Sequence, residues 1–260
     1  AKEEKQRKKV MGSEDEMRSF LAEVDASYRW REDFIRTFLE RDIPQLGFHI
    51  PARSLERLWR MCAHGHAQVL NASKIGAALG ISHHTVRSYI DILAETFLLR
   101  ILPPCEANVK KRLVKSPKIY IRDSGLLHTL LDIRFQNDLL GHPVYGASWE
   151  GFVLESIIAR TPDWRHSFYR TATGVELDLI LAKGLQTIAI ECKVSTAPKP
   201  TRGFWQALKD LSVTEAYIVA PIQEGYPVER GVKVVSITEL PEIVGKSLYE
   251  NRKIGDRPRF

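Results

Sequence analysis

Apolar side chains recur with a helical period in the first part of the chain. Between residues 14 and 47 they fall in pairs about one turn apart, as at residues 34–35 and 38–39. Pro44 interrupts this pattern. We therefore expect residues 1–50 to form a mainly helical connector.

Residues 52–102 follow a different pattern, with an amphipathic helix followed by two short helices around a tight turn. Gly80 ends the first short helix because glycine accepts positive φ, and Ser82 is a suitable N-cap for the second, which runs to about Glu95. This is the spacing of a helix-turn-helix, whose second helix can lie in a DNA major groove. We predict a winged-helix domain over residues 51–112, completed by the strand-like FLLRIL. The polar residues expected to face outward at the start of the second helix are His83, His84, Thr85, Arg87 and Ser88.

From residue 113 onward the pattern alternates between strand and helix. After a short strand at residues 119–121 come a helix carrying Glu150, three strand-like runs, a helix at TRGFWQALKDL and further strands. The core order is helix, strand, strand, strand, helix, strand. The sequence thus predicts a mixed α/β fold class, with a second domain over residues 113–245 and a tail over residues 246–260.

Four charges interrupt two otherwise apolar strands in GVELDLILAKGLQTIAIECKVS, residues 174–195. If Lys183 and Gly184 form a two-residue turn, Glu176 lies opposite Glu191 and Asp178 lies diagonal to it. Because strand side chains alternate, Glu176, Asp178, Glu191 and Lys193 then share one face. The other face is predicted to be a uniformly apolar set of Leu177, Leu179, Ile188, Ile190, Cys192 and Val194.

Carboxylates held so close repel each other and need a positive charge nearby. Lys193 is one source of that charge, and a divalent cation is another, because one or two carboxylates hold Mg²⁺ and leave positions for phosphate oxygens. Such an ion polarises a phosphodiester and lowers the pKa of a bound water. The hairpin alone favours a ribbon of cross-strand ion pairs without a metal, because charged faces on two-stranded ribbons are common.

Composition narrows the class of protein. The 260 residues carry a net charge of +6, which permits a nucleic-acid partner, and a basic cluster includes Lys110, Lys111 and Arg112. Three separate cysteines without a CxxC pair argue against a zinc site or a disulfide framework. With neither a long apolar run nor a signal-like start, we expect a cytoplasmic location without membrane contact.

The pattern D178-x12-E191-C192-K193, placed after the Glu150 helix, resembles the PD-(D/E)XK nuclease superfamily. More of the chain resembles the C-terminal region of prokaryotic AAA+ type ATPases with a C-terminal domain of unknown function. The residues that carry this resemblance are RTFLERDIPQLG, LGISHHTVRSYIDILAETFLL, KSPKIYIRDSGLL, GASWEGFVLE and FYRTATGVELDLIL with IAIECKVS.

The resemblance implies a set of roles for individual residues. It places Asp178, Glu191, Lys193 and Glu150 in a catalytic site, with Asp178 and Glu191 holding Mg²⁺ or Mn²⁺. Glu176 takes a supporting role. Arg170 contacts phosphate or pairs with Glu150 or Glu176. The motif's proline is replaced here by Leu177, which does not decide activity.

The resemblance also implies partners. The ATPase module is expected to precede this chain, and because no GxxxxGK[ST] loop is present we expect neither a nucleotide cofactor nor ATPase activity from the chain alone. DNA is the expected substrate, with contacts from His84, Thr85, Arg87, Lys110, Lys111, Arg112 and Arg170. Two alternatives stay open, which are a non-catalytic DNA-binding regulatory module and a protein-interaction module that docks the ATPase or forms a homo-oligomer.

Overall fold

The computed structural model describes residues 14–106, 111–229 and 231–239, with side chains from residue 23 onward. Within these ranges the chain forms a three-stranded and a six-stranded β-sheet with helices around both. The predicted mixed α/β class is confirmed.

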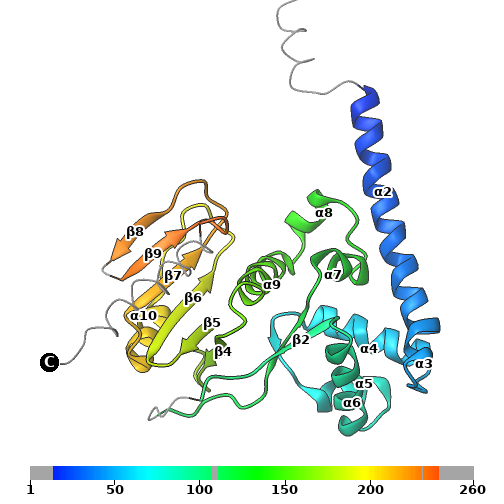
Figure 1. Cartoon of the computed structure of the whole chain (residues 1–260), viewed down its shortest axis with the longest axis horizontal. Helices are drawn as coiled ribbons and strands as arrows, with labels where there is room; N and C mark the ends of the chain where they lie inside the picture. The colour runs from blue at the N-terminus through cyan, green and yellow to red at the C-terminus, as the bar shows by residue number, and fades with distance from the viewer. Residues whose placement is uncertain (1–13, 107–110, 230, 240–260) are drawn as a thin grey trace, which may run out of the picture.

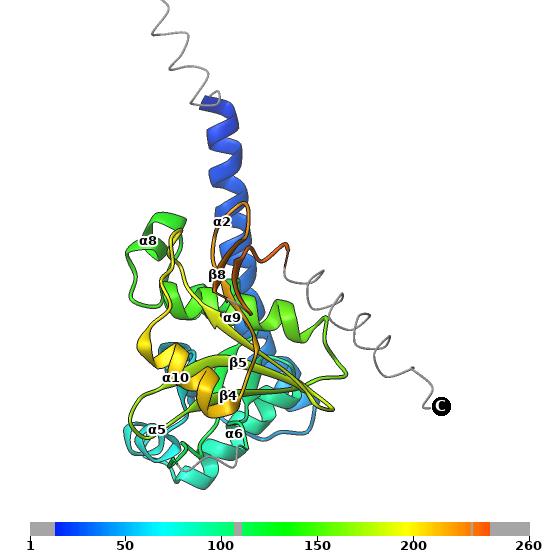
Figure 2. The same cartoon turned by 90° about the vertical axis from the view of Figure 1, so that its left-hand side faces the viewer.

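The predicted N-terminal helix is also confirmed. Helix α2 (Glu14–Thr37) continues through a π-helical turn, η1 (Phe38–Asp42), into a last turn, α3 (Ile43–Gln45). Ile35 and Phe38 are buried, and the Phe38 ring meets Trp59 edge-on with 5.9 Å between ring centroids. Figures 1 and 2 show the start of α2 projecting beyond the rest of the molecule, so its lower end anchors it.

The next elements follow the predicted two-helix pattern closely. They are α4 (Ala52–His64), β1 (Gln68–Val69), α5 (Ala72–Leu79), α6 (His83–Glu95) and β2 (Leu99–Leu102). Gly80 has a φ of 69°, and the Ser82 hydroxyl accepts a hydrogen bond from the backbone N–H of Thr85 at 3.1 Å. Val86 and Leu93 are fully buried, so α6 turns its polar N-terminal side chains outward as the sequence indicates.

Strand β3 (Lys118–Ile121) lies between β1 and β2 and pairs antiparallel with both. The sequence pattern predicts this strand as part of the second domain, whereas in the structure it is the central strand of the N-terminal sheet. The β2–β3 connection reaches across to strand β4 (Arg165–Arg170), where Pro104 bridges Phe168 and Leu113 bridges Thr171. The two halves of the molecule are therefore joined by backbone hydrogen bonds as well as by side chains.

Helices α7 (Ser124–Leu130), α8 (Gln136–Gly141) and α9 (Tyr145–Ile158) lead into the larger sheet. Its other elements are β5 (Glu176–Lys183), β6 (Gln186–Cys192), α10 (Arg202–Leu211), β7 (Glu215–Val219), β8 (Tyr226–Glu229) and β9 (Val232–Val235). The predicted order of α9, three strands, α10 and a strand is present, while β8 was not predicted.

The strand order in the six-stranded sheet is β4-β5-β6-β7-β9-β8. Strands β4, β5 and β6 form an antiparallel meander, and β6, β7 and β9 run parallel. Side chains of α9 such as Val153 pack on one face, and side chains of α10 such as Phe204 pack on the other. Figures 1 and 2 show the two helices on either side of the sheet. Among the described helices, none combines the length and apolar character needed to cross a membrane.

Candidate functional site

The β5–β6 hairpin has a different turn from the predicted one. Lys183 pairs with Gln186, so the two turn residues are Gly184, with a φ of 59°, and the exposed Leu185. The predicted turn at Lys183 and Gly184 is therefore wrong by one position, and the pairing register changes by two residues. A register change of two residues does not by itself move a side chain to the other face of the hairpin.

The corrected register brings two carboxylates closer than predicted. Leu179 pairs with Ile190, and the same register continued along the hairpin places Asp178 opposite Glu191. The backbone N–H of Cys192 donates to Asp178 Oδ2 at 2.9 Å, which fixes that carboxylate on the neighbouring strand. The predicted pairing of Glu176 with Glu191 is replaced by one of Asp178 with Glu191.

A β-bulge in β5 lies at the same point. Opposite β4, Ser167 pairs with Ile180 and Tyr169 pairs with Leu177, so β5 has one extra residue in the Asp178–Leu179 stretch. Bulges re-aim side chains and often lie beside functional sites. Here the bulge divides the predicted apolar set, because Leu179 packs on the α9 face and Leu177 on the α10 face. Of the predicted apolar set, Leu179, Ile188, Ile190 and Cys192 do share the α9 face, and Leu177 departs from it because of the bulge. The prediction of one face for all four charges is wrong for Glu176, which lies next to Leu177 and so leaves the face that carries Glu191.

The predicted catalytic residues line one cavity of about 380 Å³. Glu150 comes from α9, Asp178 from β5, and Glu191 and Lys193 from β6 and the residue just after it. The cavity is polar on all sides because the remaining lining also carries charged, amide and hydroxyl groups. Its other residues are Ala67, Gln68, Lys118, Arg170, Gly174, Glu176, Thr201 and Gly203.

Lys118, which the sequence analysis did not single out, is the central cation of this cavity. Only 1% exposed, it places its Nζ 3.0 Å from Glu150 Oε1, 2.5 Å from Glu176 Oε1 and 3.7 Å from Asp178 Oδ1. Burial alone would lower its pKa, but the surrounding carboxylates more than reverse this and raise the pKa above the ordinary value. The sequence signal for this position is a lysine that opens the short apolar strand KIYI, at the end of the basic segment VKKRLVKSPK.

Glu150 is held from the N-terminal sheet as well. The Tyr120 hydroxyl donates to Glu150 Oε1 at 2.6 Å, beside the bond from Lys118. Burial, together with the negative charge of Asp178, raises the pKa of Glu150 to about 7, against the opposing effect of Lys118. Glu150 thus keeps a proton near neutral pH more readily than an ordinary glutamate does.

Glu191 has two unlike oxygen atoms. Oε1 pairs with Lys193 Nζ at 2.7 Å, whereas Oε2 is buried and has no hydrogen-bond partner among the described residues. Burial and the charge of Asp178 raise the pKa of Glu191 to about 8, and burial also raises the pKa of Asp178. A buried carboxylate oxygen without a donor is costly, so this atom marks a position where a bound group would be stabilised.

The partner of Arg170, left open by the sequence, is Glu176. Arg170 Nη1 lies 3.2 Å from Glu176 Oε2, and about a third of the arginine side chain is exposed at the rim of the cavity. Glu176 therefore bridges Arg170 and Lys118.

The donor set suits a hard divalent cation in chemistry, because carboxylate oxygens are the ligands Mg²⁺ and Mn²⁺ prefer. The unpartnered Oε2 of Glu191, next to Asp178, is the observation that fits such an ion. Among the described residues, no group of three or more histidine, cysteine, aspartate or glutamate side chains is spaced to hold a metal as it stands. Any cation here would thus rely on one or two carboxylates and retain water ligands.

The predicted DNA-contacting residues divide between two places. His84 and Arg87 are exposed near the start of α6, and the Thr85 hydroxyl lies 2.9 Å from that of Ser82. Lys111 is engaged within the molecule, because its Nζ lies 2.6 Å from an oxygen of Asp210 on α10. Arg112 is exposed on the β2–β3 connection, and Lys110 lies outside the described residues.

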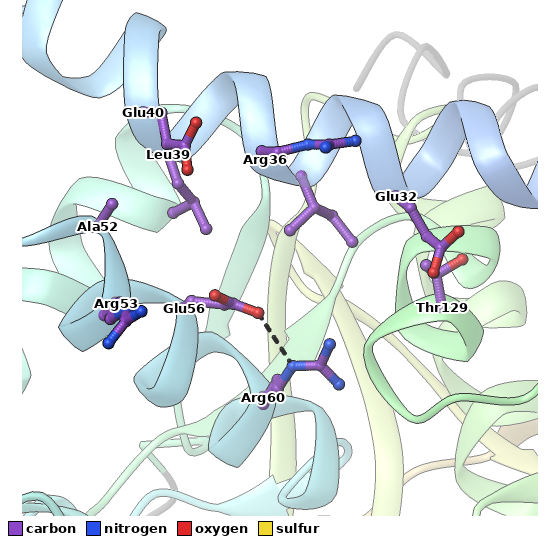
Figure 3. Close-up of a pocket in the computed structure, with 10 residues that line it drawn as sticks. Glu32, Arg36, Leu39, Glu40, Ala52, Arg53, Glu56, Arg60 and Thr129 are labelled. Atoms are coloured by element: carbon purple, nitrogen blue, oxygen red, sulfur yellow. Dashed lines mark hydrogen bonds and ion pairs between the residues drawn. The ribbon is translucent and has the colours of Figure 1, made fainter.

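A second cavity, of about 420 Å³, lies between α2, η1, α4 and α7 (Figure 3). Its acidic and basic side chains are balanced, and Glu56 pairs with Arg60 across one turn of α4 at 3.3 Å. The apolar floor comes from Ile35 and Leu39. The charged side chains that line this cavity are exposed or half-buried, so this cavity is a weaker candidate for binding or catalysis than the one at Glu191.

Comparison with known families gives two matches. Residues 18–137 match a family described as a domain of unknown function (DUF8612), and residues 145–240 match another domain of unknown function (DUF4143). The first match ends before α9 and the second begins at α9. Lys118 therefore falls in the first region, while Glu150, Asp178 and Glu191 fall in the second.

Individual relatives are also uncharacterized. Rv2008c of Mycobacterium tuberculosis and Mb2031c of Mycobacterium bovis are each 39% identical to this chain over 214 residues. The match covers 82% of this chain and 48% of each relative, so the chain spans about half the length of the relatives it matches. The crystal structure of protein VC1899 from Vibrio cholerae aligns over 86% of this chain and 53% of its own, with 14% identity and a TM-score of 0.28.

Proposed function

We propose that this chain is a DNA-acting nuclease unit in which the cavity at Asp178 and Glu191 hydrolyses phosphodiesters with a divalent cation. The observation that carries the proposal is the convergence of Glu150, Asp178, Glu191 and Lys193 on one cavity, with Glu191 Oε2 buried and unpartnered. The order of elements around the cavity, helix, three strands, helix and strand, is that of the PD-(D/E)XK nucleases that the sequence resembles.

Each side chain then has a task. Asp178 and Glu191 would hold Mg²⁺ or Mn²⁺, which supplies Lewis-acid polarisation of the phosphate and a more acidic water. Lys193, already 2.7 Å from Glu191, places a positive charge where negative charge develops on the phosphate. Arg170 lies at the rim and is positioned to contact a neighbouring phosphate group.

Duplex binding is assigned to the α4–β3 unit as a winged helix. Its support is α6, which begins at a serine cap and presents His84, Thr85 and Arg87 outward, as a recognition helix does. Arg112 adds an exposed positive charge on the connection that leads to the cavity. The contacts to DNA phosphates would be electrostatic, so the affinity for DNA should fall as the salt concentration rises.

The test is a cleavage assay with supercoiled and linear DNA in Mg²⁺ or Mn²⁺. We expect cleavage by the wild type, loss of at least about 100-fold in Asp178→Ala and in Lys193→Ala, and none in excess EDTA. A matched control is Asp163→Ala, whose carboxylate lies in the turn before β4 and pairs at the surface with Lys183, the last residue of β5. Absence of cleavage, or cleavage that survives both cavity variants, would refute the catalytic proposal.

A non-catalytic DNA- or protein-binding module is the second candidate. The observation that favours it is Lys118, whose single ammonium already lies within 3.7 Å of Glu150, Glu176 and Asp178 and offsets part of their charge without a metal ion. This candidate predicts DNA affinity that falls with salt but does not change with Mg²⁺. If a gel shift shows no DNA binding at all, size exclusion and pull-down with the rest of the relatives' chain would test a docking role instead.

The parent protein is proposed to be an AAA+ type ATPase of which this chain is the C-terminal part. The support is the sequence resemblance and the length of the mycobacterial relatives, of which the chain spans 48%. We expect no nucleotide hydrolysis by this chain, since its sequence lacks the GxxxxGK[ST] phosphate loop. An ATPase assay on the chain and on a full-length relative separates the two contributions.

A further inference from the structure

The position of Lys118 has a consequence for how the cavity takes up a cation. Its ammonium is the buried charge that the cavity carboxylates share, and it lies within 3.7 Å of three of them. Lining the cavity are four carboxylates and three cations, among the residues that the structure describes. One cation, Arg170, lies at the rim and another, Lys193, is bound to Glu191, so Lys118 alone occupies the middle.

Lys118 is also held rigidly. It pairs with Leu102 of β2 and with Val69 of β1 on the two sides of β3, so its backbone is fixed by both neighbouring strands. Its Nζ lies 5.6 Å from the centroid of the Phe168 ring, a cation–π distance. A lysine anchored in this way presents its charge from the N-terminal unit into a cavity whose other charges come from the C-terminal unit.

A divalent cation and this ammonium need the same space. An ion that used Asp178 together with Glu191 Oε2 would stand beside a carboxylate that Lys118 already contacts at 3.7 Å. Two positive charges that close in a buried cavity repel strongly, because the local dielectric is low. The neutralising role would pass from one cation to the other.

We propose that Lys118 is a positioning residue that serves as the resident cation of this cavity, and that a divalent cation binds at Asp178 and Glu191 only in competition with its ammonium. This inference rests on the proposed function in taking these two carboxylates as the cation ligands. It adds that the N-terminal unit controls cation entry through β3.

The first experiment measures Mn²⁺ affinity by electron paramagnetic resonance of the free ion at pH 7.5. Lys118→Met keeps the length and apolar contacts of the stem but removes the charge, and we expect it to bind Mn²⁺ at least about tenfold more tightly than the wild type. Lys183→Met, at an exposed pair with Asp163, is the matched control and should bind like the wild type. Arg170→Met, which removes a partly exposed charge at the rim, should give a smaller gain, about threefold or less.

A second measurement uses the wild type, because removing a buried cation from three carboxylates can prevent folding. Lys118 is 1% exposed and should resist acylation by an amine-reactive reagent in EDTA. With saturating Mn²⁺ the displaced ammonium should become reactive, as measured by mass spectrometry of the peptide. Labelling of Lys118 that does not change with Mn²⁺ would overturn the competition.

The outcomes separate this inference from the proposed function. Equal or weaker Mn²⁺ affinity in folded Lys118→Met overturns the inference and leaves the nuclease proposal standing. Tighter Mn²⁺ binding by Lys118→Met without DNA cleavage supports the inference and counts against nuclease activity. Absence of Mn²⁺ binding in both proteins overturns both.

Discussion

Gly151 on α9 packs directly against His66 of the N-terminal half, and the structure predicts that an added methyl group there is costly. A Cβ built on Gly151 would lie 2.4 Å from His66 Nε2 and 2.8 Å from His66 Cε1. The His66 ring cannot easily turn away, because its Nδ1 accepts a hydrogen bond from the backbone N–H of Ile121 at 3.0 Å and the residue is 3% exposed.

The magnitude follows from two opposing effects of Gly151→Ala. Alanine in a helix is favoured over glycine by up to about 1 kcal/mol, whereas forcing a group into a filled interior costs about 1–3 kcal/mol. Gly146, in the same helix, has no atom within 4 Å of its added Cβ and therefore shows the first effect alone. We expect the free energy of unfolding of Gly151→Ala to be about 1–3 kcal/mol lower than that of Gly146→Ala.

Urea unfolding followed by circular dichroism measures this difference. A double-mutant cycle with His66→Ala identifies the cause, because removing the imidazole should relieve the clash and make the two substitutions strongly non-additive. If Gly151→Ala is as stable as Gly146→Ala, the close contact between α9 and His66 does not exist as described. The contact between Gly151 and His66 also affects the cavity at Glu191, because Glu150 directly precedes Gly151 on α9 and is positioned by the same contact.

Three further predictions concern the cavity, the contact between the two halves and α6. The pKa of Glu191 is raised from 4.5 to about 8, so protonated Glu191 stabilises the folded protein fully below about pH 4.5, and this stabilisation is lost as the pH rises through 8. In EDTA, the unfolding free energy of the wild type should therefore fall between pH 5 and 9, and Glu191→Gln should make that fall smaller. Glu155 accepts hydrogen bonds from Arg100 at 2.8 Å and from Arg122 at 3.0 Å. Glu155→Gln should therefore lower the unfolding free energy, measured in urea, by about 1–3 kcal/mol, and an unchanged value would show that these ion pairs do not stabilise the contact between the two halves. Ser82→Ala should lower the unfolding free energy by about 1 kcal/mol, because the N-cap hydrogen bond at the start of α6 is lost. The midpoint of thermal unfolding should fall as well, and an unchanged midpoint would contradict a stabilising role for this cap.

The sequence could predict the elements whose signals are local. The helical period of α2, the Gly80 turn and the Ser82 cap each depend on a few neighbouring residues, and each is found in the structure. The predicted hairpin turn is wrong by one position. Two-residue hairpin turns need a residue with positive φ, and Gly184 can supply it either as the second turn residue, after Lys183, or as the first, before Leu185. The resulting register change is even, so the turn itself leaves the alternation of side chains unchanged, whereas the bulge moves Leu177 to the other face.

Non-local packing explains what sequence patterns could not predict. Lys118 reaches the cavity because β3 pairs with β1 and β2 and stands beside α9, which depends on contacts between residues 16 or more positions apart. The bulge at Asp178 follows from the pairing of β5 with β4, and the orphaned oxygen of Glu191 follows from the burial around it. The pattern predicted which carboxylates meet but not which cation they share.

The β2–β3 connection covers one edge of the larger sheet. Strand β4 is the last strand on its side, and an uncovered edge strand readily pairs with a strand of another molecule. In this chain Pro104 and Leu113 cover that edge by bridging Phe168 and Thr171. A fragment cut where the second family match begins, at residue 145, would expose β4 and Phe168, and is therefore expected to self-associate through strand addition.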